Sequence, residues 1–223
     1  MTILTKIRQE RSSKMVELLE DDYGVRTWEP RLNSLEELVF TVLSQNTSDI
    51  NTYRSYDKLT EVFASWDDVM NANEDDVELA IRVGGLSKIK APRIQAILKE
   101  IFHRNGKLDI ESLKLLPVLD SLKWLLSLPG VGRKTASCVL LFSFHMAAFP
   151  VDTHVFRVSK RLELFDEGIS ADKAHEILES LIPSDKYYQT HMDLIEHGRR
   201  VCFARNPICG ECKLSTICPS SSA

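Results

Sequence analysis

Long apolar runs are absent from this sequence of 223 residues. No stretch approaches the roughly 18 consecutive apolar residues that a membrane-spanning helix needs. The N-terminal segment, MTILTKIRQERSSK, has no apolar core of the kind that marks a secretory signal. Convincing strand patterns and long repeats are missing as well. We therefore expect a cytosolic protein without a membrane partner, built almost entirely from helices.

Cysteine is scarce except in one segment. Four of the five cysteines, Cys202, Cys209, Cys212 and Cys218, follow the spacing C-x6-C-x2-C-x5-C. In a reducing compartment such a group favours metal binding over disulfides. A structural zinc site usually has two short cysteine pairs separated by a finger, whereas this segment has one such pair. Four nearby thiolates suit a 4Fe–4S cluster, although zinc remains open. Cys138, in an apolar stretch, is expected to be a core thiol.

The net charge of the chain is −4, because acidic side chains outnumber basic ones. Its distribution is uneven, however. Residues 121–160 carry five basic side chains and one acidic one, and residues 197–213 carry four and one, which gives +4 and +3. The remainder of the chain then carries −11. A local basic face on an acidic body can bind a polyanion.

Helical patterns run through most of the chain. The segment NSLEELVFTVLSQ opens with Ser34 and Glu37 three residues apart, which predicts a capping box. Ser65, Asn73 and Ser170 each precede an acidic first turn, which predicts three further helix starts.

Two further apolar segments are expected to be helical. Pro92 fits the first turn of a helix over APRIQAILKEIF. The stretch ASCVLLFSF, residues 136–144, could form a buried strand by composition. Because it follows a glycine turn and is flanked by helical segments, we interpret it as a buried helix.

A glycine turn precedes that helix in LPGVGRKTA. Gly130 and Gly132 permit a tight turn that exposes backbone N–H groups, and the following helix start attracts phosphate. Such a turn suits a sequence-independent grip on a nucleic-acid backbone, but it could also be an ordinary helix–turn–helix linker. A weaker copy, VGGLSKIKA, lies at residues 83–91.

An isolated acid follows in VDTHVFRVSKRL. Asp152 could simply cap a helix that begins near Thr153. The alternative is a functional carboxylate in an otherwise apolar or basic stretch.

These motifs, LPGVGRKTA, VDTHVFRV about twenty residues later, and HGRRVCFARNPICGECKLSTIC, resemble the endonuclease III family of DNA repair glycosylases. That family belongs to a superfamily marked by a helix–hairpin–helix loop and an aspartate. The resemblance runs from about Asn33 to Cys218, in order and with the family's spacing.

The resemblance implies an all-α fold of two helical domains. One would be a six-helix barrel over residues 33–148 that carries the hairpin. The other would combine residues 1–32 and 149–223 and hold a 4Fe–4S cluster on Cys202, Cys209, Cys212 and Cys218. The implied partner is double-stranded DNA with a damaged base or abasic site, bound by a monomer. In a prokaryotic source the protein would associate with the nucleoid.

The resemblance also implies the chemistry. Lys134 occupies the position of the family's amine nucleophile, and Asp152 that of its catalytic carboxylate. A lysine amine attacks a sugar carbon only in its neutral form, and a carboxylate stabilises the positive charge that develops on the sugar. The implied activity is removal of an oxidised pyrimidine, followed by β-elimination through a Schiff base.

DNA contacts follow from the same resemblance. The SQNTSD loop would fill the space left by a flipped nucleotide through Asn46, or through Gln45 if the loop shifts. Leu86 would be a second wedge, although a leucine beside a glycine turn could equally be a core residue. The loop between Cys202 and Cys209 has one basic residue, which departs from the more cationic family pattern. The complete set of expected DNA contacts is Gln45, Asn46, Leu86, Leu128, Gly130, Val131, Gly132, Arg133 and Arg205.

Three alternatives remain. Adenine-mismatch glycosylases need a glutamate where this sequence has Thr41, and they lack the nucleophilic lysine. A thymine- or uracil-mismatch glycosylase is a closer alternative, because the motifs do not reveal the base pocket. A non-catalytic DNA-binding module that senses redox state through its cluster would not need Lys134 and Asp152.

Overall fold

The structure is a computed structural model that describes residues 3–221, and its chain divides into two compact units. One unit is continuous, Pro30–Met146, and the other combines Met1–Glu29 with Ala147–Ala223. The boundaries expected from the sequence, after residues 32 and 148, lie three and two residues further along the chain.

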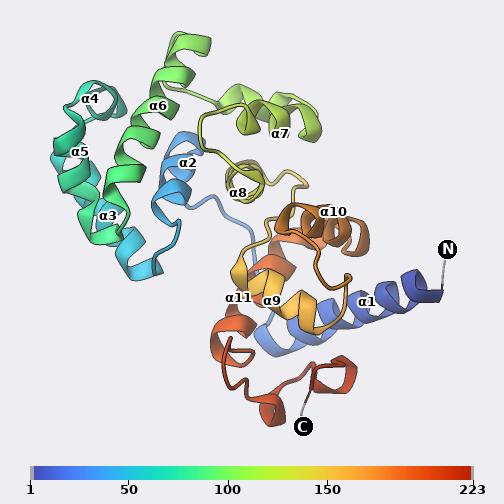
Figure 1. The fold of residues 1–223 in the computed structure, drawn as a ribbon. Coiled ribbons are helices and arrows are strands. Elements are labelled where there is room, and N and C mark those ends of the chain that lie inside the picture. Colours follow the sequence, from blue (N-terminus) through green and yellow to red (C-terminus); the bar gives the residue numbers. More distant parts are fainter. Residues whose placement is uncertain (1–2, 222–223) are drawn as a thin grey trace. The chain divides into compact units, whose positions relative to one another are not determined.

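The continuous unit contains helices and no strand among residues 30–146. The expected six helices correspond to seven α-helical segments here. The additional segment arises because α4 is a separate helix of six residues with its own N-cap at Ser65. The segments are α2 (Ser34–Leu43), α3 (Asp49–Val62), α4 (Trp66–Asn71), α5 (Glu74–Ile81), α6 (Ser87–Asn105), α7 (Val118–Leu126) and α8 (Arg133–Phe144), with short 3-10 turns η1 (Arg82–Gly84) and η2 (Glu111–Leu115) (Figure 1).

The centre of this unit is the packing of α2 against α8. The segment ASCVLLFSF is helical, as the sequence predicts, and Val139 and Leu140 on α8 are fully buried. On α2, Leu38 and Val42 are fully buried as well. Cys138 lies buried in this core, which confirms its predicted place. Apolar burial of this extent is the main force that holds the two helices together.

Three predicted helix starts match the structure, and the start of α2 needs a correction. Ser65 and Ser170 accept bonds from the backbone N–H groups of Asp68 and Lys173 as N-cap residues, and Asn73 is an N-cap without a side-chain bond. The capping box of α2 is formed by Asn33 and Glu36, one residue before the predicted Ser34–Glu37 pair. The shift frees Glu37, which is fully buried and forms a two-bond ion pair with Arg31 at 2.6 and 2.7 Å.

Pro92 does not lie in the first turn of its helix. Helix α6 begins at Ser87, so Pro92 is its sixth residue. Proline has no backbone N–H, so the carbonyl four residues earlier lacks its helical donor. The apolar face of α6, with Ile94, Leu98 and Ile101 fully buried, compensates for that loss.

The second unit is helical as well. Fully buried apolar side chains from its N-terminal and C-terminal parts, such as Met15, Phe149 and Leu194, form its core. Helix α1 packs on α10 and α11, and α9 packs on α11. No helix among residues 3–221 is long and apolar enough to cross a membrane. The elements are α1 (Ile3–Tyr23), α9 (Thr153–Arg161), α10 (Ala171–Leu181), η3 (Ser184–Lys186), α11 (Tyr187–Arg200), η4 (Cys209–Glu211) and η5 (Ser215–Ile217) (Figure 1).

Candidate functional site

The glycine hairpin between α7 and α8 exposes backbone rather than apolar side chains. Gly130 has a φ of 71°, in the left-handed region where glycine is favoured. Leu128 and Val131 are only 2% and 6% exposed, so their side chains anchor the turn in the core. A DNA contact at these two expected positions would therefore have to use their backbone.

Helix α8 begins directly after this hairpin. Its N-cap is Gly132, which has no side chain to bond the first backbone N–H groups. Unbonded N–H groups and the helix dipole favour an anion at such an end. Lys134 is the second residue of the helix and is half-buried, as is Arg133. Lys134 therefore lies directly after the glycine turn, and anion binding at this turn stays a prediction.

A second glycine turn leads into α6. Leu86 is the N-cap of this helix in a left-handed conformation, with a φ of 53°. Its side chain is 48% exposed, so the alternative of a core leucine is wrong. Exposed apolar side chains can insert between bases in DNA-binding proteins. Holding a leucine in a left-handed conformation costs free energy.

Lys90, one turn into α6, is a fully enclosed lysine that the sequence analysis did not single out. Its Nζ donates to the carbonyl of Leu43 at 2.7 Å and to that of Gly84 at 3.0 Å. Burial lowers the pKa of Lys90 to about 8. Lys90 thereby joins the C-terminal end of α2 to the turn before Leu86.

The SQNTSD loop follows α2. Asn46 is exposed and has a left-handed φ of 52°. Gln45 is half-buried, and its side-chain amide contacts Arg93 and Thr135. The two positions that the sequence left open for the same role are therefore in different environments.

In the other unit, Asp152 is the N-cap of α9. Its Oδ1 accepts from the Val155 backbone N–H at 2.7 Å, so the capping interpretation of Asp152 is confirmed. The carboxylate is half-buried. Oδ1 of Asp152 caps the helix, and the same side chain can have a second role in addition.

The four C-terminal cysteines line one pocket, together with Arg161, Val201 and Ile208 among others. Burial raises the pKa of the Cys212 and Cys218 thiols, and the neighbouring cysteines raise it further. Arg161 donates to Cys202 Sγ at 3.0 Å. Among residues 3–221, no three His, Cys, Asp or Glu side chains are grouped tightly enough to hold a single metal ion.

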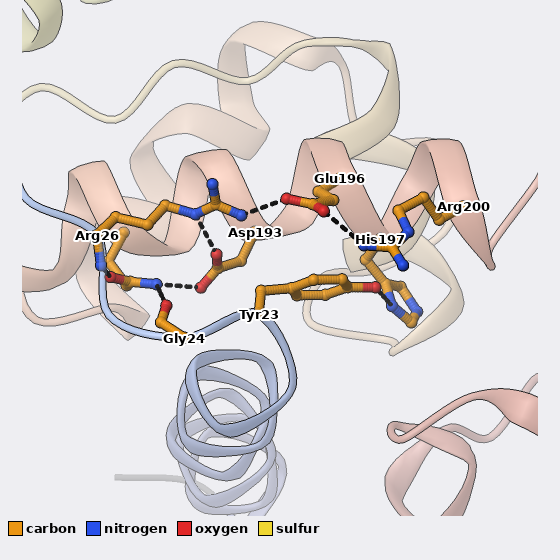
Figure 2. A network of polar contacts seen from close by, with 8 residues as sticks. Tyr23, Gly24, Arg26, Asp193, Glu196, His197 and Arg200 are labelled. Atoms are coloured by element: carbon orange, nitrogen blue, oxygen red, sulfur yellow. Dashed lines mark hydrogen bonds and ion pairs between the residues drawn. The ribbon is translucent and has the colours of Figure 1, made fainter.

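A polar network connects the end of α1 to α11 (Figure 2). It reaches the cysteine pocket through His197. Arg26 pairs with Glu196 and, at 2.7 Å, with the buried Asp193. The Tyr23 hydroxyl is 3.0 Å from His197 Nδ1, and His197 Nε2 is 3.5 Å from Cys212 Sγ. Burial lowers the pKa of His197 to about 4 and raises that of Tyr23 to about 12. A neutral His197 whose Nδ1 accepts from Tyr23 directs its Nε2–H toward the Cys212 sulfur.

Comparisons with known proteins agree with these features. The model of the HhH-GPD superfamily of base excision DNA repair proteins matches residues 39–184. Endonuclease III of Thermotoga maritima is 38% identical over 181 residues, which cover 81% of this chain and 80% of that protein. A candidate DNA glycosylase of Arabidopsis thaliana is 37% identical over 187 residues, 84% of this chain but 61% of its own length. This chain therefore spans less than two thirds of the plant relative.

A solved structure shows the same fold. The endonuclease III chain in a non-covalent complex with DNA superimposes with a TM-score of 0.81, at 29% identity, over 99% of this chain and 97% of that chain. The protein thus belongs to the HhH-GPD superfamily of base excision DNA repair proteins and to its endonuclease III family. It is an all-α DNA glycosylase of the endonuclease III type.

The sequence reasoning missed Lys90 and Arg93 of α6, and Tyr23 and His197 beside the cysteines. The basic residue types around the VGGLSKIKA turn hinted at the first pair. No pattern in the sequence indicates that a lysine of an amphipathic helix turns inward, because only the packed backbone supplies its acceptors.

Proposed function

We propose that this protein is a bifunctional DNA glycosylase and abasic-site lyase that removes oxidised pyrimidines. The observation that carries the proposal is the place of Lys134: it lies in the first turn of α8, directly after the glycine hairpin, in a helix end without a side-chain cap. The family match over residues 39–184 includes this position.

The proposed reaction begins with base release. The neutral Lys134 amine attacks the anomeric carbon of the deoxyribose, the glycosidic bond breaks, and its electron pair leaves with the base. The sugar passes through a cationic transition state, which the Asp152 carboxylate stabilises. The attached amine then loses one proton, for which a carboxylate is a suitable acceptor. The sugar ring opens as the C1′–O4′ bond breaks, O4′ takes the electron pair and a proton, and a protonated Schiff base remains.

Strand cleavage follows from the same intermediate. The protonated Schiff base makes the hydrogens of the adjacent sugar carbon acidic. Removal of one proton drives β-elimination, in which the bond to the 3′ phosphate breaks and the phosphate leaves with the electron pair. Hydrolysis of the remaining imine returns Lys134 as a free amine.

DNA recognition would use the hairpin and two loops. The backbone around Gly130 and Gly132 would contact phosphates, which positions DNA without reading its sequence. Asn46 or Gln45, and Leu86, would occupy the gap left when the damaged nucleotide leaves the stack. Arg205, exposed in the loop between Cys202 and Cys209, would add one phosphate contact and change the salt dependence rather than the base preference.

We also propose that Cys202, Cys209, Cys212 and Cys218 hold a 4Fe–4S cluster. The donor set supports it, because four thiols line one pocket and thiolates are the ligands of such clusters. When bound, the cluster would cross-link a segment in which Leu214 is the one buried residue among residues 201–221. Purified protein should then be yellow-brown with about four irons per chain. Colourless protein with one zinc would contradict the assignment.

The test of the activity is borohydride trapping on a panel of duplexes with thymine glycol, uracil, mismatched thymine or an abasic site. We expect a covalent crosslink on thymine glycol and abasic duplexes, because borohydride reduces a Schiff base to a stable amine. Selective release of mismatched thymine or uracil would instead support the mismatch glycosylase. Binding to abasic DNA without any crosslink would support the non-catalytic module.

A further inference from the structure

Arg93 of α6 contacts two separate loops of the continuous unit. Its guanidinium NH1 donates to Gln45 Oε1 at 2.8 Å in the SQNTSD loop. Its stem lies against Gly130 of the hairpin, where an added Cβ would be 2.4 Å from Arg93 Nε and 2.7 Å from Cδ. One side chain therefore lies between the loop of Asn46 and the turn before Lys134.

Gln45 extends this connection to helix α8. Its Nε2 donates to Thr135 Oγ1 at 3.4 Å, and Thr135, which is 3% exposed, directly follows Lys134. The acceptor and a donor of the Gln45 amide are thus both used inside the protein. These two contacts orient the amide between Arg93 and Thr135, and turning the side chain toward a DNA base would break both.

Two observations explain why position 130 is occupied by a glycine. Its φ of 71° already favours glycine, and the Arg93 stem occupies the space that a Cβ would take. The close approach means that the hairpin backbone and Arg93 are packed directly on each other. Movement of the hairpin would therefore disturb the Arg93–Gln45 bond.

We propose that Arg93 and Gln45 form a brace that holds the hairpin, the start of α8 and the SQNTSD loop as one rigid unit. Both are positioning residues, and Gln45 does not read the opposite base. The brace brings the candidate phosphate-binding turn and the loop of Asn46 to DNA in a fixed geometry. This role in DNA binding rests on the proposed function, whereas the mechanical role of the brace does not.

The test begins without DNA, by hydrogen exchange of the hydrogen-bonded amides of Leu128, Val131 and Ala136. Arg93→Met retains most of the stem but removes the guanidinium, and Gln45→Met removes the amide at similar volume. We expect each variant to accelerate exchange of this segment roughly tenfold, the equivalent of one lost hydrogen bond. Lys99→Met removes an exposed positive charge from the same helix and should leave exchange unchanged. Unchanged exchange in Arg93→Met would overturn the brace.

The second part measures binding to abasic duplexes with each of the four bases opposite the site. Arg93→Met and Gln45→Met should weaken binding by a similar factor for all four bases. A changed order of preference in Gln45→Met would overturn the proposal, because Gln45 would then be a base reader. If wild-type protein binds none of the duplexes, the proposed function fails, and the exchange measurement still decides the brace.

The salt dependence separates the brace from a direct phosphate contact by Arg93. A phosphate contact predicts that Arg93→Met lowers the log–log salt slope by about 1, while exchange in the hairpin stays at the wild-type rate. That combination would contradict the proposal. The brace predicts faster exchange and a slope close to that of Lys99→Met. Arg93→Lys, which retains charge but reaches Gln45 with different geometry, should resemble Arg93→Met in exchange.

Discussion

The two glycine turns of the continuous unit have related sequences and opposite side-chain placement. In VGGLSKIKA the residue after the left-handed Gly85 is Leu86, which is 48% exposed. In LPGVGRKTA the residue after the left-handed Gly130 is Val131, which is 6% exposed. The first turn thus presents an apolar side chain and the second presents backbone.

The lysines that follow these turns differ in the opposite sense. Lys90 is enclosed and donates to two backbone carbonyls, whereas Lys134 is half-buried at the start of its helix. A basic residue near a glycine turn therefore does not indicate a single role. Lys90 joins two chain segments inside the protein, whereas Lys134 lies where a substrate could reach it. The expected effects of mutations follow from this difference.

The largest effect should come from the lysine of the hairpin. Lys134→Gln should abolish both the borohydride crosslink and strand nicking, because no amine remains to form a Schiff base. Binding to abasic DNA should survive, since the backbone of the hairpin is unchanged. Trapping gels and a binding titration on the same duplex measure both. Residual crosslinking would mean that another amine is the nucleophile.

The next effect concerns a helix start that, unlike the two glycine turns, has a side-chain cap. Asp152→Asn should retain the cap of α9, because asparagine caps about as well as aspartate. Base release should nevertheless slow by about 10²–10³-fold, because the negative charge is lost. Thermal unfolding and single-turnover kinetics separate the two roles. A folded variant with wild-type turnover would leave Asp152 as a cap alone.

A smaller effect is expected when the buried Val131 and the exposed Leu86 are each replaced by alanine. Val131→Ala should lower the free energy of unfolding by about 1–2 kcal/mol, because it leaves space in a packed core. Leu86→Ala should change stability by less than about 0.5 kcal/mol, since the side chain is largely in solvent. It should instead weaken binding to abasic DNA. Equal destabilisation by both substitutions would remove the distinction between the turns.

The last effect is a pH dependence that only the buried lysine should show. The pKa of Lys90 is about 8 in the folded protein, below its ordinary value of about 10.5. Between these values the unfolded chain binds more protons, so the contribution of Lys90 to stability rises with pH. The difference in unfolding free energy between wild type and Lys90→Met should therefore grow by roughly 1–2 kcal/mol from pH 8 to pH 10. A constant difference across this range would contradict the burial of a charged amine.

Much of the fold was predictable from local patterns. The helices around Ser65, Thr153 and Ser170 begin where polar caps precede an amphipathic run, and their ends depend on residues close in sequence. The errors are also local. Asn33 competes with Ser34 for the same cap, and Pro92 is tolerated inside α6 because burial outweighs one missing hydrogen bond.

Side-chain direction could not be predicted in the same way. Leu86 and Val131 follow similar glycines, and Lys90 and Arg93 lie on a helix whose pattern indicates only amphipathicity. Their acceptors, the carbonyls of Leu43 and Gly84 and the amide of Gln45, lie on other segments of the chain.

The helical class, the family and the residue types of the candidate chemistry can be inferred from the amino-acid sequence alone, because each depends on short motifs in a fixed order. Which turn exposes its leucine, which lysine is enclosed and which glutamine is already bonded can be seen only in the folded chain. These properties depend on contacts between residues such as Arg93 and Gly130, which are 37 positions apart in the chain. A buried polar group must find its partner wherever packing places one, and that partner is not encoded near it.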